Sequence, residues 1–184
     1  MLILLVGNKR TGKDTSAAII QELTGYQRIA LADPIKEIVS QITGLTREEL
    51  EELKEDDKFK LNGKTIRQIL QDVGQGMKKL FNSEYIWTSI AYRKIKNSDA
   101  IISDVRLQSE IDFFEEALHG QVITIKLIRD VSKNDQHITE QADKLKTKYT
   151  VENNGTIDEL KIKLSRILIQ ETIPIQFGLF DKRS

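Results

Sequence analysis

A loop near the start of the chain has the residue types and spacing of a phosphate-binding loop. Residues 7–13 read Gly-Asn-Lys-Arg-Thr-Gly-Lys and match the pattern G-x-x-x-x-G-K. The loop follows an apolar run and precedes a helical pattern, which is the context that this motif requires. Glycines let the backbone curl so that successive N–H groups point at phosphate oxygens, and the lysine reaches the β- and γ-phosphates. The first turn of the following helix adds a partial positive charge of about +0.5.

We therefore predict that this loop and the next two residues hold the phosphates of a nucleotide. The predicted nucleotide-binding residues are Gly7, Asn8, Lys9, Arg10, Thr11, Gly12, Lys13, Asp14 and Thr15.

The residue after the loop lysine departs from the usual pattern. Asp14 stands where Ser or Thr is common, and the hydroxyl comes one position later, at Thr15. Asp14 could hold Mg²⁺ directly or through water, orient Lys13, or contact a phosphate acceptor. Thr15 is a second candidate ligand, and the sequence does not choose between them.

Charged residues also follow two later apolar runs. Asp104 comes two residues after the run 100–102, Arg106 two residues after Asp104, and Arg129 directly after the run 122–128. In open α/β sheets, ligands gather at the carboxyl ends of strands, so these side chains are expected beside the loop. Asp104 could hold a Mg²⁺-bound water or simply cap a helix. Arg106 and Arg129 could stabilise the charge of a phosphoryl group in transfer, although a surface salt bridge is the simpler role for Arg106.

Composition excludes several other classes of protein. Lys+Arg and Asp+Glu each number 28, so the net charge is zero and a nucleic acid or an anionic membrane is not expected as the main partner. The chain has no cysteine and two histidines, which excludes disulfides, thiolate chemistry and a histidine-rich metal site. The apolar start is too short for a signal peptide or a membrane span. We therefore expect a cytoplasmic protein.

Apolar patterning predicts strands that alternate with helices. The predicted strands are 2–6, 27–32, 100–102, 122–128 and 149–152, and the predicted helices are 13–23, 33–42, 47–55, 65–80, 84–95, 109–118 and 156–170. This alternation is typical of an α/β fold with a mainly parallel sheet, here a three-layer fold of the P-loop NTPase type. Two insertions, at about 45–95 and 129–147, interrupt it. Such insertions commonly serve as substrate clamps or lids.

Several motifs together resemble one enzyme family. They are 7–15 (GNKRTGKDT), 31–36 (LADPIK), 69–74 (ILQDVG), Trp87, 102–110 (ISDVRLQSE), 137–140 (HITE) and 153–160 (NNGTIDEL). In these the chain resembles the bacteriophage deoxynucleoside monophosphate kinases, within the nucleoside monophosphate kinase group. The resemblance implies that the γ-phosphoryl group of ATP passes, with Mg²⁺, to a deoxynucleoside 5′-monophosphate. ATP and Mg²⁺ are the implied cofactors.

The resemblance also implies a domain plan and residue roles. It implies one kinase domain over 1–184 with a five-stranded parallel core at about 1–44 and 98–172, an acceptor-binding insertion at about 45–97 and a lid at about 129–147. The implied catalytic residues are Lys13, Asp104, Arg106 and Arg129, and the implied metal ligands are Asp14, Thr15 and Asp104. The implied substrate-binding residues are Asp33, Lys36, Arg67, Gln71, Trp87, Glu110, His137 and Glu140.

Several residues and the function itself have simpler or different interpretations. Asp33 could be a helix cap, Trp87 could pack in the insertion rather than stack on a base, and His137 could be structural. The apolar tail 173–180 either packs on the core or contributes to a homodimer. Two other functions stay open. They are a P-loop kinase for another small molecule (dephospho-coenzyme A, a shikimate-like alcohol or phosphomevalonate) and a nucleotide-binding switch without phosphotransfer.

Overall fold

A computed structural model describes residues 1–95, 98–129, 142 and 144–176 of the chain. The residues form two compact units, one made of Met1–Ala30 with Lys94–Ser184 and the other of Leu31–Arg93. We call them the sheet unit and the helical unit and describe each by itself. Within the described residues, no helix is long and apolar enough to cross a membrane.

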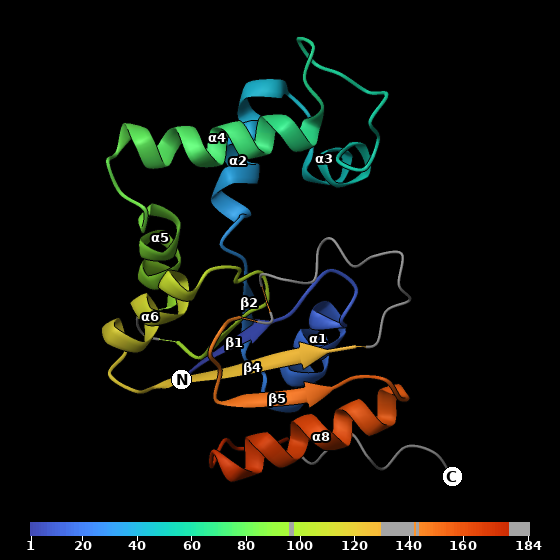
Figure 1. Cartoon of the computed structure of the whole chain (residues 1–184), viewed down its shortest axis with the longest axis vertical. Coiled ribbons are helices and arrows are strands. Elements are labelled where there is room, and N and C mark those ends of the chain that lie inside the picture. The colour runs from blue at the N-terminus through green and yellow to red at the C-terminus, as the bar shows by residue number, and fades with distance from the viewer. Residues whose placement is uncertain (96–97, 130–141, 143, 177–184) are drawn as a thin grey trace. The chain divides into compact units, whose positions relative to one another are not determined.

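The sheet unit is built on five parallel strands (Figure 1). They are β1 (Leu2–Val6), β2 (Gln27–Ile29), β3 (Ala100–Ile102), β4 (Val122–Ile128) and β5 (Tyr149–Glu152), in the order β2-β3-β1-β4-β5. All five residues of β1 are buried because this strand lies at the centre of the sheet. The loop that follows β1 therefore starts at the middle of the sheet's carboxyl edge. The predicted α/β fold with a parallel sheet is confirmed.

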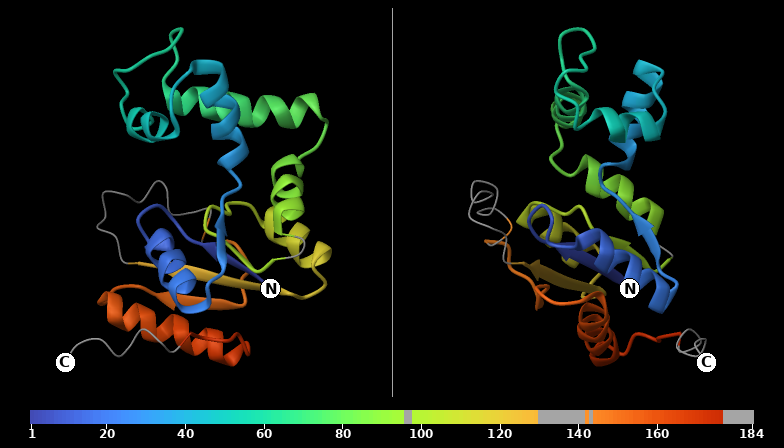
Figure 2. Two further views of the ribbon diagram at one scale, coloured as in Figure 1. Left: turned by 180° about the vertical axis from the view of Figure 1, so that it is seen from behind. Right: turned by 90° about the vertical axis from the view of Figure 1, so that its right-hand side faces the viewer.

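Helices cover both faces of this sheet. Helices α1 (Lys13–Thr24) and α8 (Ile157–Gln170) pack side by side (Figure 2), and their apolar residues form one core cluster with alternate residues of the strands. Helix α6 (Gln108–Ala117) connects β3 to β4. In the strand order this connection moves toward β5, whereas the connection from β1 to β2 moves the other way. Because such crossovers are right-handed, α6 lies on the face opposite α1. These are the three layers that the sequence predicted.

The helical unit contains α2 (Asp33–Thr43), α3 (Arg47–Leu53), α4 (Ile66–Leu80) and α5 (Ile86–Ile95), whose last turn passes the boundary at Arg93. Its core is formed by the buried side chains of Val39, Leu50 and Ile66, with partly buried apolar side chains around them. Helix α4 is continuous although the sequence places glycines in it. Gly74 is buried, and a β-carbon there would lie 3.3 Å from Cδ1 of Ile35. Close packing of α2 against α4 accounts for this glycine.

Local signals set most element ends. Thr46, Thr65 and Thr156 each begin a helix with a reciprocal capping box, and Gly25 and Gly44 end helices in the left-handed conformation.

Several element boundaries differ from those predicted, by up to three residues. Strand β2 stops at Ile29, and α2 has Ala32 as its N-cap, with Asp33 in the first turn. The N–H of Lys36 donates to the carbonyl oxygen of Ala32 at 3.0 Å, which makes Ala32, and not Asp33, the N-cap of α2.

Candidate active site

Gly7 begins the loop at the carboxyl end of β1. Its φ is 154°, and a β-carbon there would lie 2.6 Å from both the carbonyl oxygen of Leu127 and Oγ1 of Thr11. No side chain fits at such distances, so the first glycine of the motif lets the loop leave β1 close against β4. Inside the loop, the buried hydroxyl of Thr11 donates to the carbonyl oxygen of Asn8 at 3.0 Å and holds the loop in a tight turn.

Gly12 ends the loop and caps α1. It adopts φ 94°, and Arg10, two residues earlier, is also left-handed with φ 68°. When left-handed residues alternate with residues of negative φ, their backbone N–H groups turn toward one concavity. A phosphate-binding nest forms in this way. The N–H groups in the first turn of α1 have no acceptor within the helix, so they too are suited to an anion.

Lys13 folds back over this loop. Its Nζ donates to the carbonyl oxygens of Gly7 and Asn8, at 2.7 Å each. Burial lowers the pKa of the Lys13 ammonium below its ordinary value of 10.5. The Asp14 carboxylate opposes that shift, Arg106 adds to it, and Asp104 opposes it. The predicted loop lysine, strand-end aspartate and strand-end arginine therefore lie close enough to act on one another electrostatically.

Two hydrogen bonds hold the Asp14 carboxylate, one from within β2 and one from the residue after β3. Its Oδ1 accepts from the guanidinium of Arg28, at the middle of β2, at 3.0 Å, and from the hydroxyl of Ser103, directly after β3, at 3.5 Å. The Asp14 side chain is 89% exposed. A surface ion pair of this kind contributes little stability, so the pair orients Asp14 more than it stabilises the fold.

Glu110 fixes the turn that carries Arg106. Its Oε2 accepts from the backbone N–H of Arg106 at 2.8 Å and from that of Leu107 at 3.0 Å. A carboxylate at this position satisfies N–H groups that α6 cannot pair, and it complements the positive end of the helix. Arg129 follows β4 and is exposed. Its role in a lid stays a prediction, and residues 130–141 and 143 of the predicted lid lie outside the described residues.

The residues around Lys13 suit Mg²⁺ better than a metal with a full set of protein ligands. No group of three or more His, Cys, Asp or Glu side chains in the described residues could hold a metal ion. The two carboxylates that act on Lys13, from Asp14 and Asp104, and the exposed hydroxyl of Thr15 are all oxygen donors. Mg²⁺ is usually held by one or two carboxylates together with substrate phosphates and water, and this donor set fits that pattern.

The predicted acceptor residues of the helical unit carry ion pairs. Asp33 pairs with Arg47, Lys36 with Glu51 at 2.6 Å, and Arg67 with Glu55 at 2.5 Å.

Burial alone would raise the pKa of Glu51, but its hydrogen bond to Lys36 and the positive charges of Lys36 and Lys54 bring that pKa below its ordinary value. The pair between α2 and α3 is therefore charged at neutral pH.

Of the four remaining predicted residues, two belong to the helical unit and two lie outside the described residues. Gln71 is exposed on α4, whereas Trp87 is 7% exposed and its indole N–H donates to the carbonyl oxygen of Gly74 at 3.1 Å. That bond gives Trp87 a packing role, and its contact with substrate stays a prediction. His137 and Glu140 lie outside the described residues.

Three residues that contact the loop or Asp14 were not predicted. They are Arg28 in β2, Ser103 directly after β3 and Asn153 directly after β5, and only the folded sheet brings them to the loop or to Asp14. Asn153 carried a signal in the sequence, since it opens 153–160, one of the motifs of the family resemblance, but the motif gave this residue no role.

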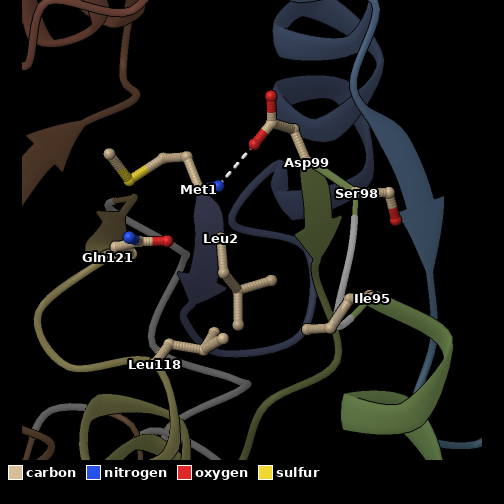
Figure 3. A pocket seen from close by; sticks show the side chains of 7 residues that line it. All are labelled: Met1, Leu2, Ile95, Ser98, Asp99, Leu118 and Gln121. Atoms are coloured by element: carbon tan, nitrogen blue, oxygen red, sulfur yellow. Dashed lines mark hydrogen bonds and ion pairs between the residues drawn. The ribbon is translucent and has the colours of Figure 1, made fainter.

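A hollow of about 310 Å³ lies at the opposite edge of the sheet (Figure 3). It is lined by Met1, Leu2, Ile95, Ser98, Asp99, Leu118 and Gln121. Its charged groups are the amino group of Met1 and the carboxylate of Asp99, which pair with each other. The hollow therefore presents one neutralised ion pair, and not the backbone N–H groups and the lysine that the loop offers to an anion.

The sequence as a whole matches a known family. A sequence model described as "Deoxynucleotide monophosphate kinase" matches residues 1–64 and 41–164. This chain belongs to the deoxynucleotide monophosphate kinase family. It is therefore a kinase that transfers the γ-phosphoryl group of ATP to a deoxynucleoside monophosphate, and the family predicted from the motifs is confirmed. Its predicted bacteriophage origin stays a prediction.

Individual relatives agree with this family. A protein of Acanthamoeba polyphaga mimivirus, described as "Putative deoxynucleotide monophosphate kinase", is 30% identical over 178 residues, covering 86% of this chain and 91% of that protein. Among solved structures, shikimate kinase from Aquifex aeolicus matches with a TM-score of 0.50 and 14% identity, over 94% of this chain and 98% of that one. The APS kinase of Mycobacterium tuberculosis matches with a TM-score of 0.51 and 8% identity, over 91% and 96%. At these identities the two structures show a shared kinase fold.

Proposed function

We propose that this deoxynucleotide monophosphate kinase holds the phosphates of ATP on residues 7–15 and uses Lys13, Arg106 and Arg129 to stabilise charge on the phosphoryl group in transfer. The observation that carries the proposal is the position of the Lys13 ammonium, which lies against the loop backbone and within electrostatic reach of Asp104 and Arg106. Phosphoryl transfer depends mainly on positioning and on electrostatic stabilisation, so these groups supply what the reaction requires.

Lys13 exchanges partners when phosphates bind. In the structure the Lys13 ammonium donates hydrogen bonds to the carbonyl oxygens of Gly7 and Asn8. Phosphate oxygens carry more negative charge than carbonyl oxygens, so they are the stronger acceptors for the same N–H groups. No strong general base is required, because the attacking group is the phosphate of the acceptor, which is already an anion.

Asp14, Thr15 and Asp104 are the residues that would hold Mg²⁺, directly or through water. The ion, when bound, would neutralise negative charge on the β- and γ-phosphate oxygens. Arg28 and Ser103 orient the Asp14 carboxylate. Asp104 acts electrostatically on Lys13 from the end of β3.

We assign binding of the acceptor to the helical unit, with Asp33, Lys36, Arg67, Gln71 and Trp87. Lys36 and Arg67 are cations whose present partners are carboxylates, Glu51 and Glu55. A phosphate of the acceptor would compete with these carboxylates for the same cations. Glu110, His137 and Glu140 complete the proposed set, with an acceptor-binding insertion at about 45–97 and a lid at about 129–147 in a single domain over 1–184.

Two broader properties belong to the same proposal. A cytoplasmic location suits a chain without cysteines that uses ATP. For the apolar tail, packing on the core is favoured for its first part, because Ile173 is buried in the core cluster and the N–H of Gln176 donates to the carbonyl oxygen of Leu23 at 2.8 Å. A homodimer contact would then involve Phe177, Leu179 or Phe180, which lie outside the described residues.

The test is a substrate panel. ADP release from ATP and Mg²⁺ is measured with every deoxynucleoside and ribonucleoside monophosphate and with small alcohols such as shikimate. We expect turnover that depends on a deoxynucleoside monophosphate. Lys13→Ala should lower that turnover by roughly a hundred- to a thousandfold with an unchanged circular dichroism spectrum. Near-normal turnover in Lys13→Ala, or turnover with alcohols alone, would contradict the assignment of the site.

A further inference from the structure

A buried asparagine from the last strand of the sheet holds the phosphate-binding loop. Asn153 directly follows β5 and is 8% exposed, and its backbone N–H donates to the carbonyl oxygen of Ile128 at 2.7 Å. Its side-chain Nδ2 donates to the carbonyl oxygen of Thr11 at 2.9 Å. Thr11 is itself 3% exposed, so this hydrogen bond is closed off from water. The bond joins two segments that are 142 positions apart in the chain.

The chemistry of this contact requires an amide. A carbonyl oxygen can only accept, so the group that faces Thr11 must be a donor. Among side chains of this length, asparagine offers an N–H donor without a charge. An aspartate would place a carboxylate oxygen against the carbonyl oxygen of Thr11, and a buried acceptor without a donor is unfavourable.

The bond also sets the direction of the next N–H group. Thr11 C=O and Gly12 N–H belong to the same peptide, and no cis peptide bond is present in the described chain. In a planar trans peptide these two groups point in opposite directions. Fixing the Thr11 carbonyl on Asn153 therefore aims the Gly12 N–H away from the Asn153 side chain.

Gly12 shows the same contact from the other side. A β-carbon on Gly12 would lie 2.3 Å from Nδ2 of Asn153, so any side chain at position 12 would push the amide away. The second glycine of the motif thus makes room for Asn153 as well as adopting a left-handed φ of 94°.

We propose that Asn153 is a positioning residue for ATP: it holds the peptide between Thr11 and Gly12 so that the Gly12 N–H faces the phosphates. Asn153 acts through the loop and does not itself touch the phosphates. This inference rests on the proposed function, in which residues 7–15 bind the phosphates of ATP.

The experiment compares Asn153→Asp and Asn153→Ala with the matched control Asn154→Asp. The control makes the same chemical change and adds the same charge one residue later, on an exposed side chain. For each protein we would measure kcat, the KM for ATP, the KM for the acceptor and the Kd for inorganic tripolyphosphate, which probes the loop without a base or sugar. Thermal unfolding of each variant reports stability.

We expect Asn153→Asp and Asn153→Ala to weaken tripolyphosphate binding and to raise the KM for ATP by roughly ten- to a hundredfold, the range for an unpaired buried polar group. The KM for the acceptor should stay near the wild-type value, and Asn154→Asp should behave as wild type. A purely structural role predicts a different result, namely a lower amount of active enzyme with both KM values unchanged. That result, or wild-type affinity for tripolyphosphate in both Asn153 variants, would overturn the proposal.

Two outcomes separate this inference from the proposed function. If Lys13→Ala abolishes transfer while the Asn153 variants keep the wild-type KM for ATP, the proposed function stands and the role of Asn153 is wrong. If the wild-type enzyme itself does not bind tripolyphosphate or ATP, the proposed function fails. Should both Asn153 variants be unfolded, the wild-type enzyme gives the answer by NMR. The Gly12 amide proton must shift when tripolyphosphate is added, and an unchanged Gly12 signal on saturation would refute the inference.

Discussion

The surroundings of Lys13 act on the pKa of its ammonium group in both directions. Burial lowers the pKa of this ammonium, and the positive charge of Arg106 lowers it further, whereas Asp14 and Asp104 raise it. Since only the protonated lysine attracts phosphates, nucleotide affinity must fall as pH rises through a pKa below 10.5. If Lys13 binds the phosphates as proposed, we expect its pKa to set the alkaline limit of nucleotide binding.

Removal of the Arg106 charge tests this balance. Arg106→Gln takes away a cation that lowers the pKa of Lys13, so the loss of affinity should move to higher pH. The measurement is the Kd of ADP between pH 7 and pH 10.5 by calorimetry. Arg166→Gln makes the same change on an exposed part of α8 and should leave the pH profile unmoved. A profile that shifts to lower pH in Arg106→Gln would contradict the assigned direction.

Asp104 is the carboxylate at the end of β3 that acts on the loop lysine. If it helps to hold Mg²⁺, Asp104→Asn should raise the Mg²⁺ concentration needed for half-maximal rate by about ten- to a hundredfold, the range seen for groups that support metal ligands. Initial rates over a Mg²⁺ titration at fixed free ATP give this value. Asp158→Asn, on the exposed first turn of α8, is the matched control. An unchanged Mg²⁺ requirement in Asp104→Asn would remove Asp104 from the metal site.

At the scale of elements, the start of α6 links stability to activity. Glu110 pairs the N–H groups of Arg106 and Leu107, whereas Glu159 makes a comparable bond at the start of α8, far from Lys13 in the chain. Replacing either with Ala should cost about 1 kcal/mol of unfolding free energy, or roughly 2–4 °C in Tm. Only Glu110→Ala should also lower kcat, because only that turn carries Arg106. Equal kcat values in the two variants would show that Glu110 acts on the fold alone.

Elements governed by local patterns were predictable from the sequence, and contacts between distant segments were not. The apolar run of β1, the Thr46 and Thr156 capping boxes and the phosphate-binding loop are all read from neighbouring residues. By contrast, the reason for a glycine at position 74 inside α4 is the packing of Ile35, a tertiary contact that neighbouring residues do not show.

The same reason explains what was missed at the candidate site. In the sequence, Arg28 and Asn153 look like ordinary polar residues of a strand and a turn. Their contacts with Asp14 and Thr11 follow only from the sheet order β2-β3-β1-β4-β5. Lys36 was predicted as an acceptor residue, but its pairing with Glu51 depends on how α3 packs on α2. Residue type and spacing therefore indicate the chemistry, whereas the partners of each charge follow from the fold.

For the whole molecule, the two substrate sites that we propose fall in different units. The nucleotide loop belongs to the sheet unit, and Lys36 and Arg67 belong to the helical unit. A ligand stabilises the states that bind it, by about 2.7 kcal/mol at a hundred times its Kd. Regions of a protein open with their own free energies, so that stabilisation is measurable region by region as protection from hydrogen exchange.

Hydrogen exchange with each substrate alone tests this division. ADP should increase protection of the amides of β1 and α1, and a deoxynucleoside monophosphate should increase protection in α2 and α4. Lys13→Ala should lose the effect of ADP and keep that of the monophosphate, because its change lies in the sheet unit alone. If the monophosphate instead protects only β1 and α1, the acceptor binds in the sheet unit, and the assignment of Lys36 and Arg67 to the acceptor is wrong.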